Sequence, residues 1–175
     1  MRTSATLDRE RFSELFEAHY AQVQAFAVRR VGRDLADEVT AETFLVAWRR
    51  LDAVPVQPLP WLYGVARNMI ARELADSAKQ AKATRLIARE RLGPALEDDC
   101  EHEPLWEAWE QLTDSDREIL SLVVWDELPV RDAARVLRVP TSVFSVRLHR
   151  ARRRLERHLR QAAVPGTPAV REATR

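Results

Sequence analysis

Apolar residues recur at three- and four-residue intervals along the first fifty positions, which is the spacing of amphipathic helices. The first of these stretches ends at Val31-Gly32, and Gly32 is suited to cap the end of a helix. A second helix is predicted from about residue 34 to residue 51. Its expected apolar stripe consists of Phe44, Ala47, Trp48 and Leu51. The pattern therefore predicts two consecutive amphipathic helices.

Three prolines within residues 52–60 forbid a helix there and stiffen a loop. Pro60 can then occupy the first turn of a third helix. The side chains expected to face a core on this helix are Trp61, Leu62, Val65, Met69 and Ile70. Residues 8–78 are thus expected to form a first module of three helices with one rigid loop.

Residues 79–103 contain no Phe, Tyr or Trp, and Gly93-Pro94 interrupts any helix that could form there. So long a stretch is unusual as a connection inside a compact domain, and we interpret it as a flexible linker. A second module is expected over residues 104–162. Residues 163–175, with two prolines and a glycine, are expected to form a disordered tail.

The second module has the pattern of a helix-turn-helix. Ser115 and Glu118 have the spacing of a capping box, ahead of the apolar stretch 119–125. Pro129 can open a short helix to Leu137, with Ala133, Ala134 and Leu137 facing inward. Residues 138–140 then turn the chain, and a long basic helix is predicted from about 141 to 159. A short helix, a tight turn and a longer basic helix are typical of this DNA-binding motif.

Composition narrows the fold class. The chain of 175 residues has four glycines, where average usage would give about twelve, and it has no Asn-Gly or Asp-Gly hairpin signal. We therefore expect an all-α protein of two small helical domains joined by a flexible linker. Cys100 is the single cysteine, so no internal disulfide can form. No apolar run reaches ten residues and no signal-peptide core is present, which indicates a soluble, cytoplasmic chain without membrane insertion.

The net charge of +1 conceals a separation of charge. Residues 97–118 hold ten acids and one base, whereas residues 138–160 hold eight arginines and one acid. On the predicted last helix, Arg147, Arg150, Arg154 and Arg157 form a stripe beside the apolar side chains. An isolated charge run is usually a solvated surface, but its place on the second helix of a helix-turn-helix favours phosphate contact along a DNA groove.

Two sets of motifs resemble one protein family. Residues 112–120, 128–137 and 146–155 resemble region 4 of the extracytoplasmic-function (ECF, group IV) sigma factors of the sigma-70 family. Independently, residues 36–49 resemble region 2.2 and residues 61–68 resemble region 2.3. The resemblance implies a dissociable subunit of bacterial RNA polymerase that directs core polymerase to promoters. It assigns sigma region 2 to the first module and sigma region 4 to the second.

The resemblance also implies partners and contact residues. Core polymerase would bind through its beta-prime clamp helices and its beta flap, and an anti-sigma factor is a further candidate partner. The implied contacts with the clamp helices are Glu38, Glu42, Phe44 and Trp48. Phe44 and Trp48 share the apolar stripe, however, so we interpret them first as core residues. Glu38 and Glu42 lie four residues apart and can meet a basic partner from one helix face.

Region 2 of the family melts the minus-10 element and captures its non-template strand. Capture requires stacking surfaces for unpaired bases, a pocket for a flipped base and cations for the backbone. The loop 52–60 is the expected pocket wall. The expected minus-10 contacts are Trp61, Tyr63, Arg67, Asn68 and Arg72, with Lys79, Lys82 and Arg85 as further weak strand contacts.

Region 4 of the family reads the minus-35 element as duplex DNA. The expected contacts are Ser142, Ser145, Val146, Arg147, Arg150 and Arg154. Arg147 and Arg150 are the first candidates among them, because a guanidinium can bind guanine through two hydrogen bonds or hold a phosphate. Several positions depart from the family pattern, among them Arg138, Ser145 and Ala41. Arg138 replaces the usual turn glycine, which either imposes a positive φ on a non-glycine residue or alters the turn. Ser145 and Ala41 replace a basic residue and a glutamine, respectively.

Other interpretations stay open at this stage. A transcription regulator could bind duplex DNA through the second module without polymerase, and a helical protein-binding module could use the arginine stripe against an acidic partner. Catalysis has little support, because no metalloprotease spacing and no glycine-rich phosphate loop is present. We interpret Cys100-Glu101-His102 as part of a solvated acidic linker, and we expect no metal and no cofactor.

Overall fold

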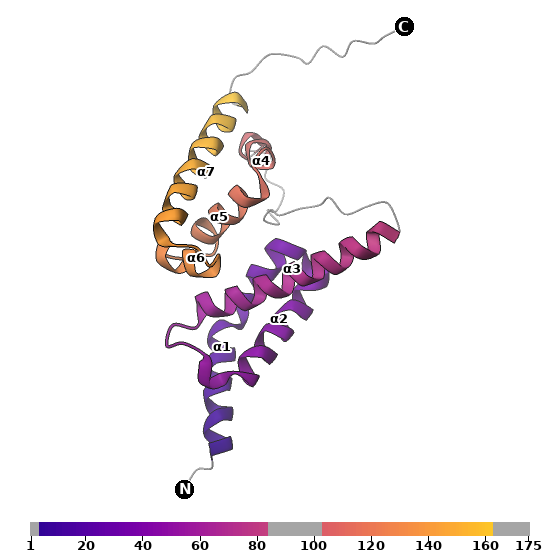
Figure 1. Cartoon of the computed structure of the whole chain (residues 1–175), viewed down its shortest axis with the longest axis vertical. Helices are drawn as coiled ribbons and strands as arrows, with labels where there is room; N and C mark the ends of the chain where they lie inside the picture. The colour runs from indigo at the N-terminus through magenta and orange to yellow at the C-terminus, as the bar shows by residue number, and fades with distance from the viewer. Residues whose placement is uncertain (1–3, 84–102, 163–175) are drawn as a thin grey trace.

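The computed structural model describes residues 4–83 and 103–162 (Figure 1). Its elements in chain order are α1 (Ser4–Val31), α2 (Arg33–Arg49), a 3-10 helix (Leu51–Ala53), α3 (Leu59–Ala83), α4 (Glu103–Glu110), α5 (Asp114–Val124), α6 (Val130–Val136) and α7 (Thr141–Ala162). No strand occurs in these two ranges, which confirms the all-α expectation. Most of the predicted linker, with Arg85 and Cys100, and the predicted tail lie outside the described residues.

Helices α1, α2 and α3 form the first module. Helix α1 ends as predicted at Gly32, whose φ of 76° suits glycine and whose N–H donates to the Val28 carbonyl at 3.0 Å. After the proline loop, α3 begins at Leu59, one residue before the expected start, and continues to Ala83, five residues past the expected module end. The buried side chains come from all three helices: Val23, Phe26, Ala27, Ala36, Val39, Phe44, Ala47, Leu62, Tyr63, Ala66 and Ile70.

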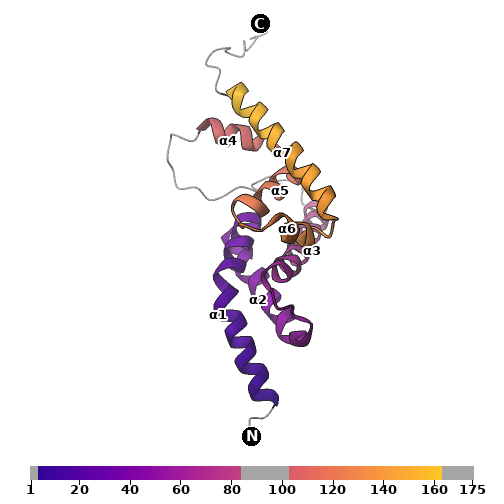
Figure 2. The same cartoon turned by 90° about the vertical axis from the view of Figure 1, so that its left-hand side faces the viewer.

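Helices α4 to α7 form the second module, in which α7 packs against α4, α5 and α6 (Figures 1 and 2). The predicted capping box was wrong by two residues. Helix α5 begins at Asp114, and the Thr113 hydroxyl accepts from the Asp116 N–H at 3.2 Å. Thr113 and Asp116 therefore cap the helix in place of Ser115 and Glu118. Phe144, Leu148 and Ala151 of α7 are buried as expected.

The turn between α6 and α7 shows how the chain accommodates Arg138. Its φ is 55°, so of the two alternatives, a positive φ at this non-glycine residue or an altered turn, the first holds. The Val139 N–H donates to the Ala134 carbonyl at 3.0 Å, and the Arg138 N–H donates to the Arg135 carbonyl at 3.1 Å. These two bonds are those of a Schellman motif, which ends α6 and sets the start of α7.

Replacing Arg138 with Gly is expected to raise the free energy of unfolding by about 0.5–1 kcal/mol. The left-handed conformation costs a non-glycine residue about 1–2 kcal/mol, and the greater freedom of glycine in the unfolded chain offsets part of this gain. Urea unfolding followed by circular dichroism measures the change. Arg138→Ala is the matched control, since it removes the side chain but keeps the backbone strain; equal stabilisation by both variants would contradict the explanation.

The two modules are in contact. Helix α3 packs against α6, and the second module lies over α3 and the C-terminal end of α1 (Figures 1 and 2). Within the described residues, no helix is long and apolar enough to cross a membrane.

Candidate nucleic-acid and polymerase interfaces

Helix α7 presents one exposed polar face beside the helix-turn-helix turn. Its buried side holds Phe144, Leu148 and Ala151, which fixes the rotation of the helix against the core. The rest of the helix surface exposes five of the six residues expected at the minus-35 element: Ser142, Ser145, Val146, Arg147 and Arg150. At about 100° per residue, these positions cover about 200° of the helix circumference. The Ser145 hydroxyl donates to the Thr141 carbonyl at 2.9 Å. All five side chains are accessible on the N-terminal half of α7.

Arg154, the sixth candidate, has a different environment. Its Nη1 donates to both carboxylate oxygens of Asp116 at 2.7 Å, and Asp116 is only 4% exposed. The Thr113 hydroxyl donates to the same carboxylate at 2.8 Å. Arg154 thus connects the middle of α7 to the first turn of α5 while its side chain stays 44% exposed, and its expected DNA contact stays a prediction.

Beyond this face, the basic surface continues along α7. A hollow is lined by arginines one to two turns farther on, with a single acid among them: Arg150, Arg153, Arg154, Glu156, Arg157 and Arg160. A row of guanidinium groups attracts a phosphate backbone independently of sequence. This part of α7 is suited to positioning DNA rather than to reading its bases.

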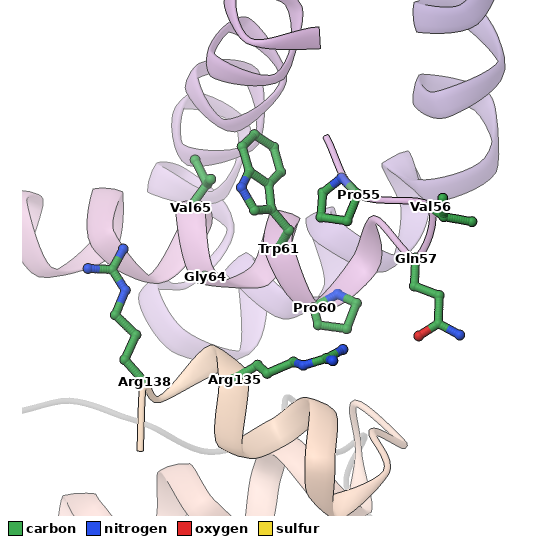
Figure 3. Close-up of a pocket in the computed structure, with 9 residues that line it drawn as sticks. All are labelled: Pro55, Val56, Gln57, Pro60, Trp61, Gly64, Val65, Arg135 and Arg138. Carbon is green, nitrogen blue, oxygen red and sulfur yellow. The ribbon is translucent and has the colours of Figure 1, made fainter. Parts of the chain in front are cut away.

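The proline loop and the start of α3 form one wall of a cleft of about 660 Å³. Pro55, Gln57, Pro60 and Trp61 lie on this wall (Figure 3). The cleft lies between the two modules, so the base pocket expected at this loop stays a prediction. The opposite wall comes from the second module, through Arg135 of α6 and Arg138 of the turn. Trp61, which was expected both to face the core and to contact the minus-10 strand, is partly buried. Its side chain therefore belongs wholly neither to the core nor to the exposed surface.

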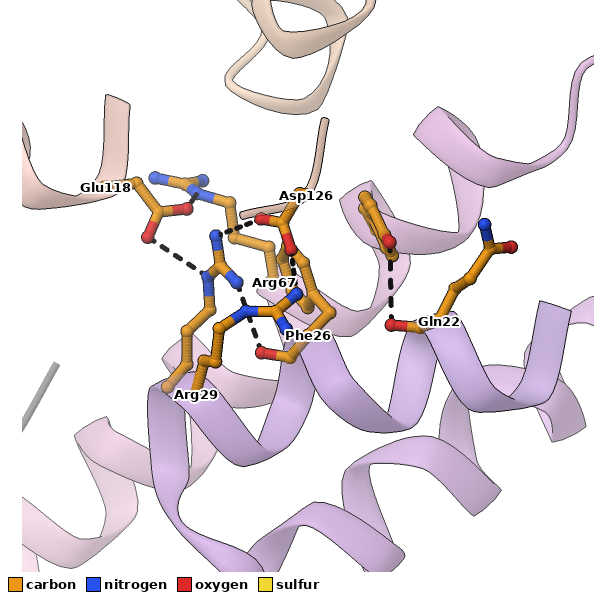
Figure 4. Close-up of polar contacts among 8 residues, drawn as sticks. Gln22, Phe26, Arg29, Arg67, Glu118 and Asp126 are labelled. Atoms are coloured by element: carbon orange, nitrogen blue, oxygen red, sulfur yellow. Dashed lines mark hydrogen bonds and ion pairs between the residues drawn. The ribbon is translucent and has the colours of Figure 1, made fainter. Parts of the chain in front are cut away.

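Tyr63 does not reach the surface. It is 2% exposed, its ring stacks on Phe26 with centroids 4.3 Å apart, and its hydroxyl donates to the Gln22 carbonyl at 3.5 Å (Figure 4). Burial, with a further contribution from the nearby Asp126 carboxylate, raises the pKa of Tyr63 to about 12. Tyr63 is therefore a neutral core residue in this structure, which corrects its expected role as a DNA contact.

The other minus-10 candidates lie along α3 outside the cleft wall. Arg67 is partly exposed, with its Nε 3.7 Å from the Glu118 carboxylate of the second module (Figure 4). Asn68 is partly buried, and Arg72 is exposed. Arg72 borders a small hollow together with Glu38 and Glu42 of α2. The candidate strand contacts and the candidate polymerase contacts are thus neighbours on the first module.

The clamp-helix candidates divide by burial. Glu38 and Glu42 are exposed on one face of α2, and Phe44 is 2% exposed, as expected of a core residue. Trp48, by contrast, is 43% exposed, so its assignment to the core was wrong. Trp48 packs edge-on against Phe12 of α1, with ring centroids 5.1 Å apart.

Sequence reasoning missed an exposed apolar patch next to Trp48. Phe16 is 37% exposed, Tyr20 is 38% exposed and Leu45 is 37% exposed. Phe16 meets Phe44 edge-on, with ring centroids 4.8 Å apart, and Tyr20 stacks on Phe44 at 6.2 Å, so buried and exposed rings form one aromatic group across α1 and α2. The sequence did show that the apolar stripe on α1 is wider than one buried face can use. A contiguous exposed apolar patch of this kind marks an interaction site.

The described residues contain no group of three His, Cys, Asp or Glu side chains that could hold a metal ion. The exposed groups on these surfaces are arginines on α7 and carboxylates and aromatic rings on α1 and α2.

Comparison with known families agrees with both modules. A family model described as Sigma-70 region 2 matches residues 15–80, and one described as Sigma-70, region 4 matches residues 102–155. The two matches together span most of the chain. The chain belongs to the sigma-70 family, and it is a sigma factor, a class of transcription-initiation protein that is not enzymatic.

Solved structures with a similar fold include a sigma factor. The sigma factor RpoE from Bartonella quintana, solved in complex with the anti-sigma factor NepR, is 21% identical, with a TM-score of 0.67; the match covers 85% of this chain and 96% of RpoE. CnrH, solved in complex with the cytosolic domain of CnrY, is 21% identical, with a TM-score of 0.57 and coverage of 86% and 88%. No curated protein matches the sequence significantly.

Proposed function

We propose that this protein is an ECF (group IV) sigma factor that binds core RNA polymerase and directs it to promoters in the cytoplasm. Region 2 captures the melted minus-10 strand, and region 4 reads the minus-35 duplex. The observation that carries the proposal is the exposed face of Ser142, Ser145, Val146, Arg147 and Arg150 on α7, directly after a helix-turn-helix turn. Because regions 2 and 4 occur in one chain, this function is favoured over a regulator that acts without polymerase.

On the first module, the exposed carboxylates Glu38 and Glu42 with the adjoining aromatic patch are the proposed contact for the beta-prime clamp helices. Carboxylates favour a basic partner, and exposed rings supply apolar area to bury against it. The proposed strand contacts are Trp61, Arg67, Asn68 and Arg72. The beta flap is the proposed polymerase contact of region 4. An anti-sigma factor is a further proposed partner, as in the complex of RpoE with NepR.

Reconstituted run-off transcription with bacterial core polymerase on genomic fragments tests this function. A sigma factor gives discrete start sites only when both proteins are present, and it binds DNA weakly alone. Specific, tight binding to duplex DNA without polymerase, together with no co-migration with core polymerase, would contradict the proposal.

Replacing Arg147 with Ala is expected to weaken binding to the minus-35 duplex by about 1–3 kcal/mol if its guanidinium reads a base. A phosphate contact would instead leave promoter preference unchanged and lower the salt slope of binding by about one. Fluorescence anisotropy of the polymerase holoenzyme on labelled duplexes over a salt series distinguishes the two. Arg152→Ala, also exposed on α7 but about 140° around the helix, is the matched control. Equal effects of both variants would rule out a specific role for Arg147.

A further inference from the structure

Two valines are exposed near the start of α7, beside the arginines expected to contact the minus-35 element. Val143 is 38% exposed and Val146 is 51% exposed, whereas Phe144 and Leu148 of the same helix are 0% and 5% exposed. Val143 was not among the residues expected to contact DNA. A single exposed valine is ordinary on a protein surface, so the position of these two on the helix decides what they mean.

The two valines share one narrow face of α7 with two arginines. Val143, Val146, Arg147 and Arg150 stand at positions i, i+3, i+4 and i+7, and all four are exposed. At about 100° per residue they cover about 100° of the helix circumference. Val146 lies about 160° around the helix from the buried Leu148, so it points away from the core. We call these four residues the valine–arginine face.

The two serines expected at the minus-35 element lie outside this face. Ser142 and Ser145 are about 40° and about 100° farther around the helix from Val146. The Ser145 hydroxyl already donates to the Thr141 carbonyl at 2.9 Å, so its proton is engaged within the helix. Hydrogen bonding from the valine–arginine face is therefore left to its two arginines, while the valines present methyl groups.

The valine–arginine face begins directly after the turn of the helix-turn-helix. The Phe144 N–H donates to the Pro140 carbonyl at 3.0 Å, which places Val143 and Val146 in the first two turns of α7. In this motif the N-terminal residues of the second helix reach the base edges in the major groove. The arginine hollow farther along α7 suits the phosphate backbone, so the valines lie where base edges are expected.

The chemistry of the major groove limits what a valine can recognise there. Each base presents hydrogen-bond donors or acceptors, and among the four DNA bases only thymine adds a methyl group. A valine forms no hydrogen bond, and covering the polar edge of another base would separate that edge from water without replacing its partner. Arg147 and Arg150, by contrast, have the donors that fit the O6 and N7 atoms of guanine. The face therefore combines apolar groups that fit thymine with cations that fit guanine.

We propose that Val143 and Val146 are specificity-determining residues that read the 5-methyl group of thymine in the minus-35 duplex, close to a guanine bound by Arg147 or Arg150. This role rests on the proposed function of region 4 and deepens it. From Val143 to Arg150 the face extends about 10 Å along the helix axis, which corresponds to about three base steps of about 3.4 Å. The thymine and the guanine are therefore expected within about three base steps of one another.

Replacing thymine with uracil tests this role, because it removes the 5-methyl group and keeps every hydrogen-bonding atom of the base. The preferred minus-35 sequence is first selected from randomised duplexes with the holoenzyme of core polymerase and the full-length chain. Each thymine of that sequence is then replaced by uracil in turn, and affinity is measured by fluorescence anisotropy. Burial of one methyl group is worth about 0.8 kcal/mol, so the expected loss at a contacted thymine is about fourfold.

The double variant with Val143→Ala and Val146→Ala is expected to bind the thymine and uracil duplexes equally. The two single variants show which valine contacts which thymine. Val124→Ala is the matched control, because it removes the same two methyl groups from a valine of α5 that is 56% exposed, and it should keep the fourfold difference. Circular dichroism verifies that each variant is folded.

A selected sequence without thymine, or an affinity that no uracil replacement lowers, overturns the reading of thymine. A fourfold loss that persists in the folded double variant overturns it as well, because another group then contacts the methyl group. Run-off transcription with the same holoenzyme reports separately on the proposed function. Discrete start sites without any effect of uracil contradict only the role of the valines. If the holoenzyme selects no sequence and gives no discrete start site, the proposed function fails and the role of the valines with it.

Discussion

Replacing Tyr63 with Ala is expected to lower the free energy of unfolding by about 3–5 kcal/mol, the range for large aromatic truncations in a core. The ring is 2% exposed and stacks on Phe26, so its removal leaves a cavity between α1 and α3. Urea unfolding followed by circular dichroism measures the loss. Tyr63→Phe keeps the stacked ring and gives up only the long hydroxyl bond to the Gln22 carbonyl, so it should cost less than about 1 kcal/mol.

The same pair of variants separates a core role from a DNA contact. Tyr63→Phe is expected to leave binding to single-stranded minus-10 DNA by the holoenzyme unchanged. Weaker strand binding by Tyr63→Phe at full stability would show instead that the hydroxyl contacts DNA.

Tyr63 also predicts an alkaline dependence of stability. The pKa of the folded state, about 12, lies above the ordinary value of 10.0. Stability from the neutral phenol is therefore full below pH 10 and is lost as the pH rises from 10 through about 12. Tyr63→Phe should flatten this part of the stability curve; an unchanged curve would mean that another group titrates there.

Replacing Arg154 with Ala is expected to lower the free energy of unfolding by about 2–3 kcal/mol. The change leaves the Asp116 carboxylate, 4% exposed, with the Thr113 hydroxyl but without its cation. Removing one partner of a fully buried ion pair costs roughly 3–5 kcal/mol of stability. The expected loss for Arg154→Ala is smaller, because the Arg154 side chain is 44% exposed and therefore already partly solvated. Urea unfolding again gives the measurement.

Arg153→Ala is the matched control for Arg154→Ala, since Arg153 is the adjacent exposed arginine on the same helix. It is expected to leave stability within about 0.5 kcal/mol. Arg154→Lys should recover part of the loss, because it restores the charge but not the donor geometry of the guanidinium. Weaker duplex binding by Arg154→Ala with unchanged stability would show instead that Arg154 acts as a DNA contact.

Local patterns predicted the elements well because their causes are local. The apolar periodicity, Gly32 and the proline loop placed α1 to α3, and the start of α7 at Thr141 agrees with the expectation. The positive φ of Arg138 was one of two alternatives that the sequence left open, and the bonds of the Schellman motif show that the turn keeps its usual conformation. The exposed face of α7 followed from the alternation of arginines with apolar residues along one helix.

The errors arose where two local readings were equally good. Capping-box spacing is shared by two pairs, Thr113 with Asp116 and Ser115 with Glu118. The structure uses the first pair, in which the Asp116 carboxylate is buried and accepts from Arg154, 38 residues later in the chain. Trp48 and Tyr63 are both aromatic residues at helical spacing, yet α1 covers Tyr63 and leaves Trp48 exposed.

The sequence by itself determined the helices, the two modules, the separation of acidic from basic segments and the resemblance to sigma factors, since each depends on neighbours within a few turns of helix. Only the tertiary structure decided which polar groups are paired. Arg30 and Asp126 lie 96 residues apart, and nothing in their local surroundings distinguishes them from other surface charges. Burial and pairing are properties of surfaces brought together from distant segments, so the link between the two modules became visible only in three dimensions.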